Sequence, residues 1–260
     1  MPLRFTPIRR YMSSPVRSLQ VDATLADAHA ILREHAFSSL PVLDPKGTPA
    51  GVLSRTDLLR VGRVTEHRPG RASLLEVPDR QVGEVMSSPV VSLGPDDTVR
   101  AAAEKMVRHR IHRVYVVEHG RLVGVFSTRD VMAAVRDQRI ATPINEFMST
   151  PVLTVDVADT VGCATDRLSE ARVAGLVVTE DERPVGLFTQ TEALQSREDP
   201  ASTPVEDRMS YALLCMDLKT PVHRAAAHAH ATQARRVVAV EGRRMWGLLT
   251  GVDFARAATG

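Results

Sequence analysis

The chain of 260 residues carries 33 lysines and arginines against 31 aspartates and glutamates, and 43% of its residues are hydrophobic. This composition is typical of a folded globular protein and excludes a disordered chain or a basic nucleic-acid-binding tail. Aromatic residues make up only 4%, which leaves little material for base stacking. The two cysteines, Cys163 and Cys215, lack CxxC spacing, which argues against a disulfide framework and a structural zinc site.

The hydropathy pattern bears on localisation. No apolar stretch reaches the roughly 18 residues of a membrane span, and the first fifteen residues lack the apolar core of a secretory signal. We therefore expect a cytoplasmic protein with neither a membrane nor a nucleic acid as its partner.

Two short motifs each occur four times. A Met-Ser pair opens each stretch, at Met12, Met86, Met148 and, in a degraded form, Met209. A glycine-led apolar run ending in Ser/Thr-x-x-Asp/Glu closes each stretch, at residues 51–57, 124–130, 186–192 and 247–253. Both motifs keep the same register along the chain, so we predict four copies of one structural unit.

The elements of one copy follow in chain order. Alternating residues after the first motif, as in 90–93, predict a short strand. A threonine then precedes a run with helical periodicity and is placed to cap it, at Thr24, Thr98, Thr160 and Thr220. Two further apolar runs predict two strands, and the closing motif begins a last helix. The predicted fold is therefore α/β, with β-α-β-β-α copies that pair to cover an exposed sheet face.

These elements divide the chain into residues 1–62, 81–138, 139–199 and 200–260, with a basic linker at 63–80. We expect the first two copies to form one module, 1–138, and the last two another, 139–260, with a boundary near 136–142. Residues 61–80 favour a solvated surface loop, where limited proteolysis should cut first. A docking segment for an acidic partner is the alternative.

The four copies resemble the cystathionine β-synthase (CBS) domain, and the resemblance covers about residues 8–257. In this family two adjacent units pack sheet against sheet about a pseudo-twofold axis. Their clefts commonly hold AMP, ADP, ATP or S-adenosylmethionine, and the units usually regulate an attached or partner protein. The resemblance implies a non-catalytic sensor with an adenine nucleotide as regulatory ligand and no other cofactor.

The closing acids suit this ligand chemically. A carboxylate at a helix start can accept hydrogen bonds from both ribose hydroxyls, and the helix N-terminus favours phosphate. The same Ser/Thr-x-x-acid pattern is also a capping box, and a repeated helix needs a repeated cap. The resemblance implies ribose contact, above all at Asp57 and Asp130. The closing-motif candidates are Ser54, Arg55, Asp57, Ser127, Arg129, Asp130, Thr189, Glu192, Thr250 and Asp253.

A second set of candidates concerns the phosphates. His112 and Arg113 resemble the phosphate-contacting His-Arg pair of the γ subunit of AMP-activated protein kinase, and Arg113 with Arg129 could hold a phosphate. A basic helix C-terminus stabilised by the macrodipole is the alternative. The third copy has Gly175 at the matching position, so its phosphate site should be weak or empty, whereas the fourth has Arg236. First-strand candidates are Ser18, Ser92 and Thr154.

Other functions remain open at this point. The chain has no GxGxxG, GxxxxGK[ST], GxSxG or HExxH motif, so we expect no enzyme. A sensor of S-adenosylmethionine or of a dinucleotide would use the same carboxylates with fewer arginines, and a ligand-free interaction scaffold is a further alternative. We expect no metal site, because His109 and His112 lack acidic or cysteine companions. The regulated protein is unknown, and a homodimer is open.

Overall fold

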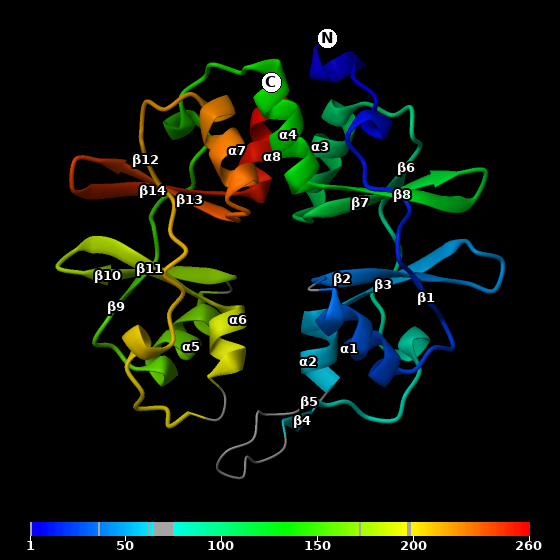
Figure 1. The fold of residues 1–260 in the computed structure, drawn as a ribbon, viewed down its shortest axis with the longest axis horizontal. Helices are drawn as coiled ribbons and strands as arrows, with labels where there is room; N and C mark the ends of the chain where they lie inside the picture. The colour runs from blue at the N-terminus through cyan, green and yellow to red at the C-terminus, as the bar shows by residue number, and fades with distance from the viewer. Residues whose placement is uncertain (1, 36, 62, 65–74, 172, 197–198) are drawn as a thin grey trace. The chain divides into compact units, whose positions relative to one another are not determined.

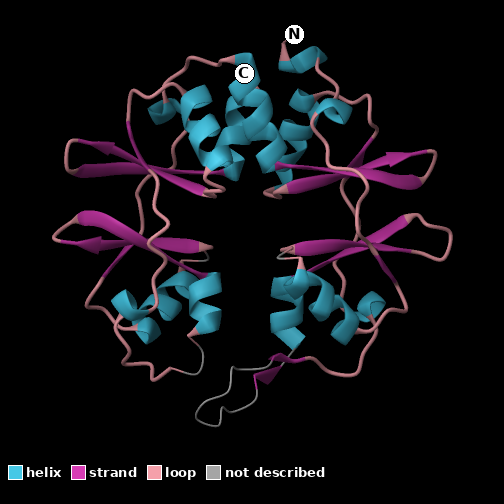
Figure 2. Cartoon of the chain, in the orientation of Figure 1, coloured by secondary structure: helices cyan, strands magenta, loops and turns pink. Residues whose placement is uncertain are grey.

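The computed structural model describes residues 2–35, 37–61, 63–64, 75–171, 173–196 and 199–260. Within these residues, four three-stranded sheets are accompanied by helices, which confirms the α/β prediction (Figures 1 and 2). The contacts between Cα atoms divide the chain into two compact units, Leu3–Ser127 and Thr128–Gly260.

The first two copies have the predicted element order. The first comprises η2 (Ile8–Arg10), β1 (Leu19–Gln20), α1 (Leu25–Glu34), β2 (Ser39–Leu43), β3 (Pro49–Ser54) and α2 (Arg55–Val61). The second comprises η3 (Val82–Glu84), β6 (Ser92–Leu93), α3 (Val99–His109), β7 (Arg113–Glu118), β8 (Arg121–Ser127) and α4 (Thr128–Gln138). The short helix η1 (Leu3–Phe5) precedes them.

The last two copies repeat this order. The third comprises η4 (Ile144–Glu146), β9 (Thr154–Asp156), α5 (Val161–Glu170), β10 (Gly175–Glu180), β11 (Arg183–Thr189) and α6 (Gln190–Gln195). The fourth comprises η5 (Val205–Asp207), β12 (Cys215–Asp217), α7 (Val222–Ala231), β13 (Arg236–Glu241), β14 (Arg244–Thr250) and α8 (Gly251–Ala257). All four copies therefore share the β-α-β-β-α order, each preceded by a turn of 3-10 helix.

The four three-stranded sheets share one topology. The middle strand pairs parallel with the short first strand, across a helical connection, and antiparallel with the third strand, across a hairpin. In three copies the hairpin turn contains a glycine with positive φ: Gly47 at +82°, Gly120 at +78° and Gly242 at +60°. In the third copy Asp181 and Glu182 adopt φ of +48° and +62° instead.

The threonine caps are confirmed in three copies. The Oγ1 atoms of Thr24, Thr98 and Thr160 accept hydrogen bonds from backbone N–H groups three residues later, at 3.1, 3.1 and 3.2 Å. The prediction for Thr220 is wrong, because Pro221 is the N-cap of α7 and makes no side-chain cap. The helix begins one residue later than the threonine pattern predicts, and proline is compatible with that start.

The residues that precede the first strand of each copy pack on its partner copy. We call the 3-10 helix and the Met-Ser pair the lead segment: residues 8–13, 82–87, 144–149 and 205–210. Ser87 of the second lead segment exchanges two backbone hydrogen bonds of 2.9 Å with Val52 of β3. Ser13 pairs in the same way with Val125 of β8, so the exchange is reciprocal. In the other unit the same bridges form at Ser149 with Leu248 and at Ser210 with Leu187.

This exchange completes the hydrophobic cores. Val82 and Val85 of the second lead segment are buried in the core of the first copy, against Leu25 and Leu53. Val205 and Met209 of the fourth lead segment are likewise buried in the core of the third copy. The orange chain that leads to β12 in Figure 1 runs from one sheet of this pair to the other. Partner copies therefore share their hydrophobic cores.

Sheet also packs on sheet within a pair. Val177 and Leu187 of the third copy lie in one apolar cluster with Val238 of the fourth, and Val152 and Met245 pack around it. Partners thus meet through the sheet faces that their own helices leave uncovered.

The division between the compact units falls between Ser127 and Thr128. Helix α4 therefore groups with the last two copies, through its packing on α7 and α8. The proposed module boundary near residues 136–142 stays a prediction. Residues 65–74 of the basic linker, where we expect first cleavage, lie outside the described residues, and strands β4 (Arg63–Val64) and β5 (Leu75–Glu76) pair beside them.

Candidate nucleotide-binding site

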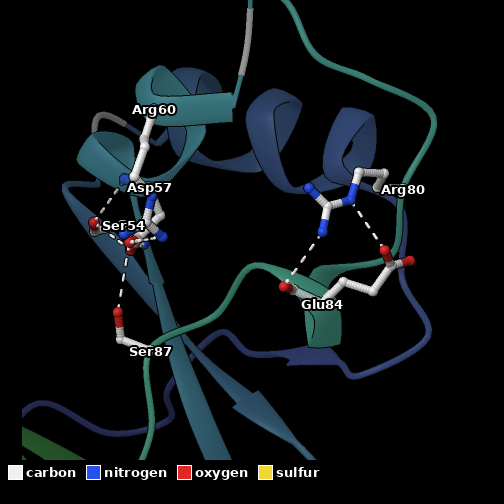
Figure 3. A network of polar contacts seen from close by, with 6 residues as sticks. All are labelled: Ser54, Asp57, Arg60, Arg80, Glu84 and Ser87. Carbon is white, nitrogen blue, oxygen red and sulfur yellow. Dashed lines mark hydrogen bonds and ion pairs between the residues drawn. The ribbon is translucent and has the colours of Figure 1, made fainter.

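The closing acid of the first copy caps its own helix. The Oδ2 atom of Asp57 accepts hydrogen bonds from the backbone N–H and the hydroxyl of Ser54, at 2.9 and 2.6 Å. Its Oδ1 atom accepts from Arg60 at 3.3 Å and from Ser87 Oγ at 3.5 Å (Figure 3). Since Ser87 belongs to the second lead segment, the carboxylate joins both copies of the pair. Asp57 is only 8% exposed.

The fourth copy repeats this network. Thr250 donates to Asp253 Oδ2 from its backbone N–H at 2.6 Å and from its hydroxyl at 2.7 Å. Ser149 of the third lead segment donates to Asp253 Oδ1 at 3.2 Å, and Arg256 makes an ion pair with it at 3.0 Å. Asp253 is 1% exposed. Both acids are thus held by a capping hydroxyl, an arginine three residues later and a serine of the partner copy.

The third copy keeps the cap without the arginine. The backbone N–H of Thr189 donates to Glu192 Oε2 at 2.9 Å, and its hydroxyl donates to the same oxygen. Gln195 stands three residues later, where the first and fourth copies have arginine, and the second copy has Ala133 there. The capping interpretation is confirmed in these three copies, and ribose contact stays a prediction.

The two candidate arginines of the middle strands reach across the pairs. Arg113 begins β7 and donates to Ser38 Oγ at 2.6 Å and to the Ser39 carbonyl at 3.4 Å, both in the first copy. Arg236 begins β13 and donates to the Ala174 carbonyl of the third copy at 2.9 Å. Each arginine therefore stands at the interface between partner copies.

Arg236 shows how closely the partner backbone approaches. A Cβ on Gly175 would lie 2.9 Å from the Arg236 guanidinium carbon, so a larger residue would require this guanidinium to shift. Burial lowers the pKa of Arg236 below its usual range; nearby Arg235 adds to this effect and Glu192 opposes it. The guanidinium nevertheless keeps its charge at neutral pH, because its ordinary pKa is far above 7.

Other predicted residues lie at separate places. Arg55 donates to the Leu32 carbonyl at 3.0 Å, which ties it to the end of α1 in its own copy. His112 is exposed and immediately precedes β7. Arg129 and Asp130 lie in the first turn of α4, which groups with the other compact unit. Their convergence with Arg113 stays a prediction.

The first-strand candidates occupy equivalent places. Ser92 begins β6 opposite Tyr115, and Thr154 begins β9 opposite Val177. Ser18 directly precedes β1. Each candidate thus lies beside a middle strand, on the sheet that faces the partner copy.

Two kinds of residue contact the closing acids without having been predicted from the sequence. Arg60 and Arg256 could have been found, because both stand three residues after a closing acid. The serines of the lead segments, Ser87 and Ser149, carry no such signal, because their acid belongs to another copy.

Two absences concern the described part of the chain. No group of three or more histidine, cysteine, aspartate or glutamate side chains there could hold a metal ion. Within the same residues, no helix combines the length and the apolar character needed to cross a membrane.

The fold defines a protein of tandem, pairwise exchanged α/β repeats. The chain belongs to the CBS domain family, whose family model matches residues 8–63, 82–137 and 144–199. The fourth copy lies outside these matches, yet it has the same element order and the same capped closing acid.

Two solved structures match nearly the whole chain. One is a conserved protein from Pyrococcus horikoshii, with a TM-score of 0.73 and 18% identity, covering 97% of this chain and all of the other. The second is protein MJ1225 from Methanocaldococcus jannaschii, proposed as an archaeal homologue of g-AMPK. It has a TM-score of 0.75 and 14% identity and covers 96% of this chain and 99% of the other. At these identities the likeness shows the fold.

A curated relative matches a smaller share of this chain than the two solved structures do. A 33.4 kDa protein encoded in the ribosomal RNA operon of Thermofilum pendens is 29% identical over 184 residues. The match spans 65% of this chain and 57% of that protein, little more than half of its length.

Proposed function

We propose that this chain is a non-catalytic regulatory protein that binds an adenine nucleotide, AMP, ADP or ATP, between paired CBS copies. Ligand occupancy would be passed to a partner protein. The observation that supports this most is Arg113, which reaches from the second copy to Ser38 and Ser39 of the first. A guanidinium at this interface can hold a phosphate through charge-assisted hydrogen bonds.

The carboxylates of the closing acids would recognise the ribose of the nucleotide. Asp57 uses Oδ2 for its helix cap and Oδ1 for Arg60 and Ser87. A ribose diol would bind at Oδ1 in place of these two donors, leaving the cap intact. The exchange is inexpensive, because Arg60 is largely exposed and such an ion pair contributes at most about 1 kcal/mol.

Regulation follows from the exchange of lead segments. Ser87 contacts Asp57 and belongs to the segment that also completes the core of the first copy. A ligand at Oδ1 would release the Ser87 hydroxyl and so alter how the second lead segment is held. Binding and the geometry of the pair are therefore coupled.

One observation favours a second function, a ligand-free interaction scaffold. The carboxylates of Asp57 and Asp253 are already satisfied by the protein's own donors and are nearly buried. A scaffold needs nothing more of them than the helix caps. A sensor of S-adenosylmethionine or of a dinucleotide is the alternative within the sensor class.

Isothermal titration of the full chain with AMP, ADP, ATP, S-adenosylmethionine and NAD tests the proposal. We expect saturable binding of at least one of the three adenine nucleotides, and tighter binding than for S-adenosylmethionine. Binding of S-adenosylmethionine or NAD alone would assign the chain to the alternative sensor. Heats that match buffer for all five compounds would favour the scaffold.

A further inference from the structure

The hydroxyl of Tyr115 is a buried polar group. The residue is 2% exposed, and among the described residues no group makes a hydrogen bond of acceptable geometry to its Oη atom. A buried hydroxyl without a partner is destabilising, and native structures tolerate few of them. Such a group usually serves a ligand, an ordered water or a function.

The position of Tyr115 makes the hydroxyl more unusual. The matching residues in the third and fourth copies are Val177 and Val238, which lie in the apolar cluster between their two sheets. Packing alone therefore does not require a hydroxyl at this position. The first copy has Pro41 at this position, so the tyrosine occurs only in the second of the four copies.

The surroundings of the hydroxyl are polar. Tyr115 and Arg113 are two residues apart in β7, so both side chains lie on the same face of the sheet. Ser92 is opposite Tyr115 in the neighbouring strand. Burial raises the pKa of the Tyr115 hydroxyl, while Arg113 and Ser39 beside it oppose that rise. The hydroxyl is thus protonated at neutral pH and can donate a hydrogen bond.

The Arg113 guanidinium has more N–H donors than its hydrogen bonds to the first copy use. A guanidinium carries five N–H donors, and the bonds to Ser38 and Ser39 use two of them. Exposure increases from Tyr115, which is buried, through Arg113, which is half-buried, to Ser92, which is exposed. The hydroxyl therefore lies next to side chains that are partly or fully exposed.

We propose that the Tyr115 hydroxyl and the Arg113 guanidinium bind one phosphate group of the ligand in the first pair of copies. This inference rests on the proposed function and names the part of the ligand that the first pair selects. Two donors that converge on one anion favour a phosphorylated ligand over adenosine, which lacks an anionic group, and over S-adenosylmethionine, which carries a cationic sulfonium. The second pair has Arg236 with Val238 and lacks the hydroxyl donor, so its selection for phosphate is weaker.

The test is Tyr115→Phe in the full chain, titrated with ADP and with adenosine. We expect ADP to bind the first pair about tenfold more weakly, equivalent to ~1.4 kcal/mol. Adenosine affinity should change less than twofold. The unliganded variant should melt at or above the temperature of the original protein, because the unpartnered hydroxyl is gone. Tyr211→Phe, which changes a tyrosine that is 68% exposed, is the matched control.

Several outcomes decide the inference. ADP affinity that is unchanged in Tyr115→Phe, or an equal loss for ADP and adenosine, overturns it and leaves the proposed function standing. If the original protein binds no adenine nucleotide, the proposed function fails with it. Should Tyr115→Phe fold poorly, Tyr115→Val, which copies the residue at Val177 and Val238, provides the same comparison.

Discussion

The sulfur of Met12 lies 2.6 Å from the position that a Cβ atom on Gly124 would occupy. Met12 is in the lead segment of the first copy, and Gly124 is in β8 of the second. Met209 and Gly186 repeat the relationship at 2.7 Å in the other compact unit. The methionine of each opening motif thus packs closely on the glycine of a closing motif, and the two belong to partner copies.

Gly124→Ala should therefore destabilise the protein without touching the proposed ligand groups. The new methyl group would overlap the Met12 sulfur, and overpacking of this kind typically costs about 1–3 kcal/mol. Urea unfolding followed by circular dichroism should show a lower midpoint with an unchanged slope.

Gly94→Ala is the matched control for this prediction. A methyl group at Gly94 would contact only Asp97 Oδ2 at 3.6 Å, an ordinary distance. Adding Met12→Ala to Gly124→Ala should recover part of the loss, because the double variant removes the overlap. Equal midpoints for the two glycine variants would refute the role of the contact.

The Met–Gly contact also shows what the sequence could predict. The two motifs reveal the copies and their element order, because strand alternation, helix periodicity and caps are local properties. Neither motif says that Met12 packs on the second copy, because the same residues would fit a contact within one copy. The exchange of lead segments is a long-range property that only the folded chain shows.

The candidate site likewise has a part that the sequence predicts and a part that only the fold shows. The capping of Asp57 follows from spacing alone, since Ser54 is three residues away. The serine that shares this carboxylate, Ser87, is thirty positions further along the chain and lies in a different copy. Thr220 fails as a cap because a local pattern can shift by one residue when proline is available at the helix start.

Asp130→Ala separates the ribose and capping roles in the second copy. If Asp130 binds the ribose, the variant should lose about 1.5–3 kcal/mol of nucleotide binding, the scale of hydrogen bonds to a charged group. If Asp130 only caps α4, the variant should lose roughly 1 kcal/mol of stability and keep its affinity. Calorimetric titration and thermal melting of the same sample measure both quantities.

Asp27→Ala is the control for that experiment. Asp27 lies in the first turn of α1, and its carboxylate accepts a hydrogen bond from Thr24 at 2.7 Å, but it is outside the closing motif. Its loss should lower the melting temperature and leave affinity unchanged. An Asp130→Ala variant that behaves like Asp27→Ala would remove Asp130 from the site.

A surface ion pair should make stability depend on pH in acid. Arg208 donates to both oxygens of Asp199, at 2.5 and 2.6 Å, and this hydrogen bonding lowers the pKa of the Asp199 carboxyl. A carboxyl with a lowered folded-state pKa adds stability above its unfolded pKa, near 4, and that stability is lost as pH falls through the folded value.

Arg208→Gln should therefore lower the free energy of unfolding at pH 7, and only slightly, because the pair lies at the surface. The difference from the original protein should shrink as pH falls below about 4 and vanish once Asp199 is protonated in both states. Urea unfolding across this range measures it, with Arg243→Gln as an exposed control. A difference that stays constant with pH would show that the ion pair is not its cause.

Arg60 provides the last prediction, because it competes with the ligand proposed for Asp57. Its guanidinium occupies Oδ1 at 3.3 Å, where a ribose hydroxyl would bind. Arg60→Ala should free that oxygen and strengthen nucleotide binding at the first copy by up to about fivefold, the equivalent of the ≤1 kcal/mol of an exposed pair. Arg100→Ala breaks a comparable exposed ion pair with Glu104, at 3.0 Å, and should leave affinity unchanged. Weaker binding in Arg60→Ala would instead place the guanidinium on the ligand, as a phosphate contact, and would contradict its role as a competitor.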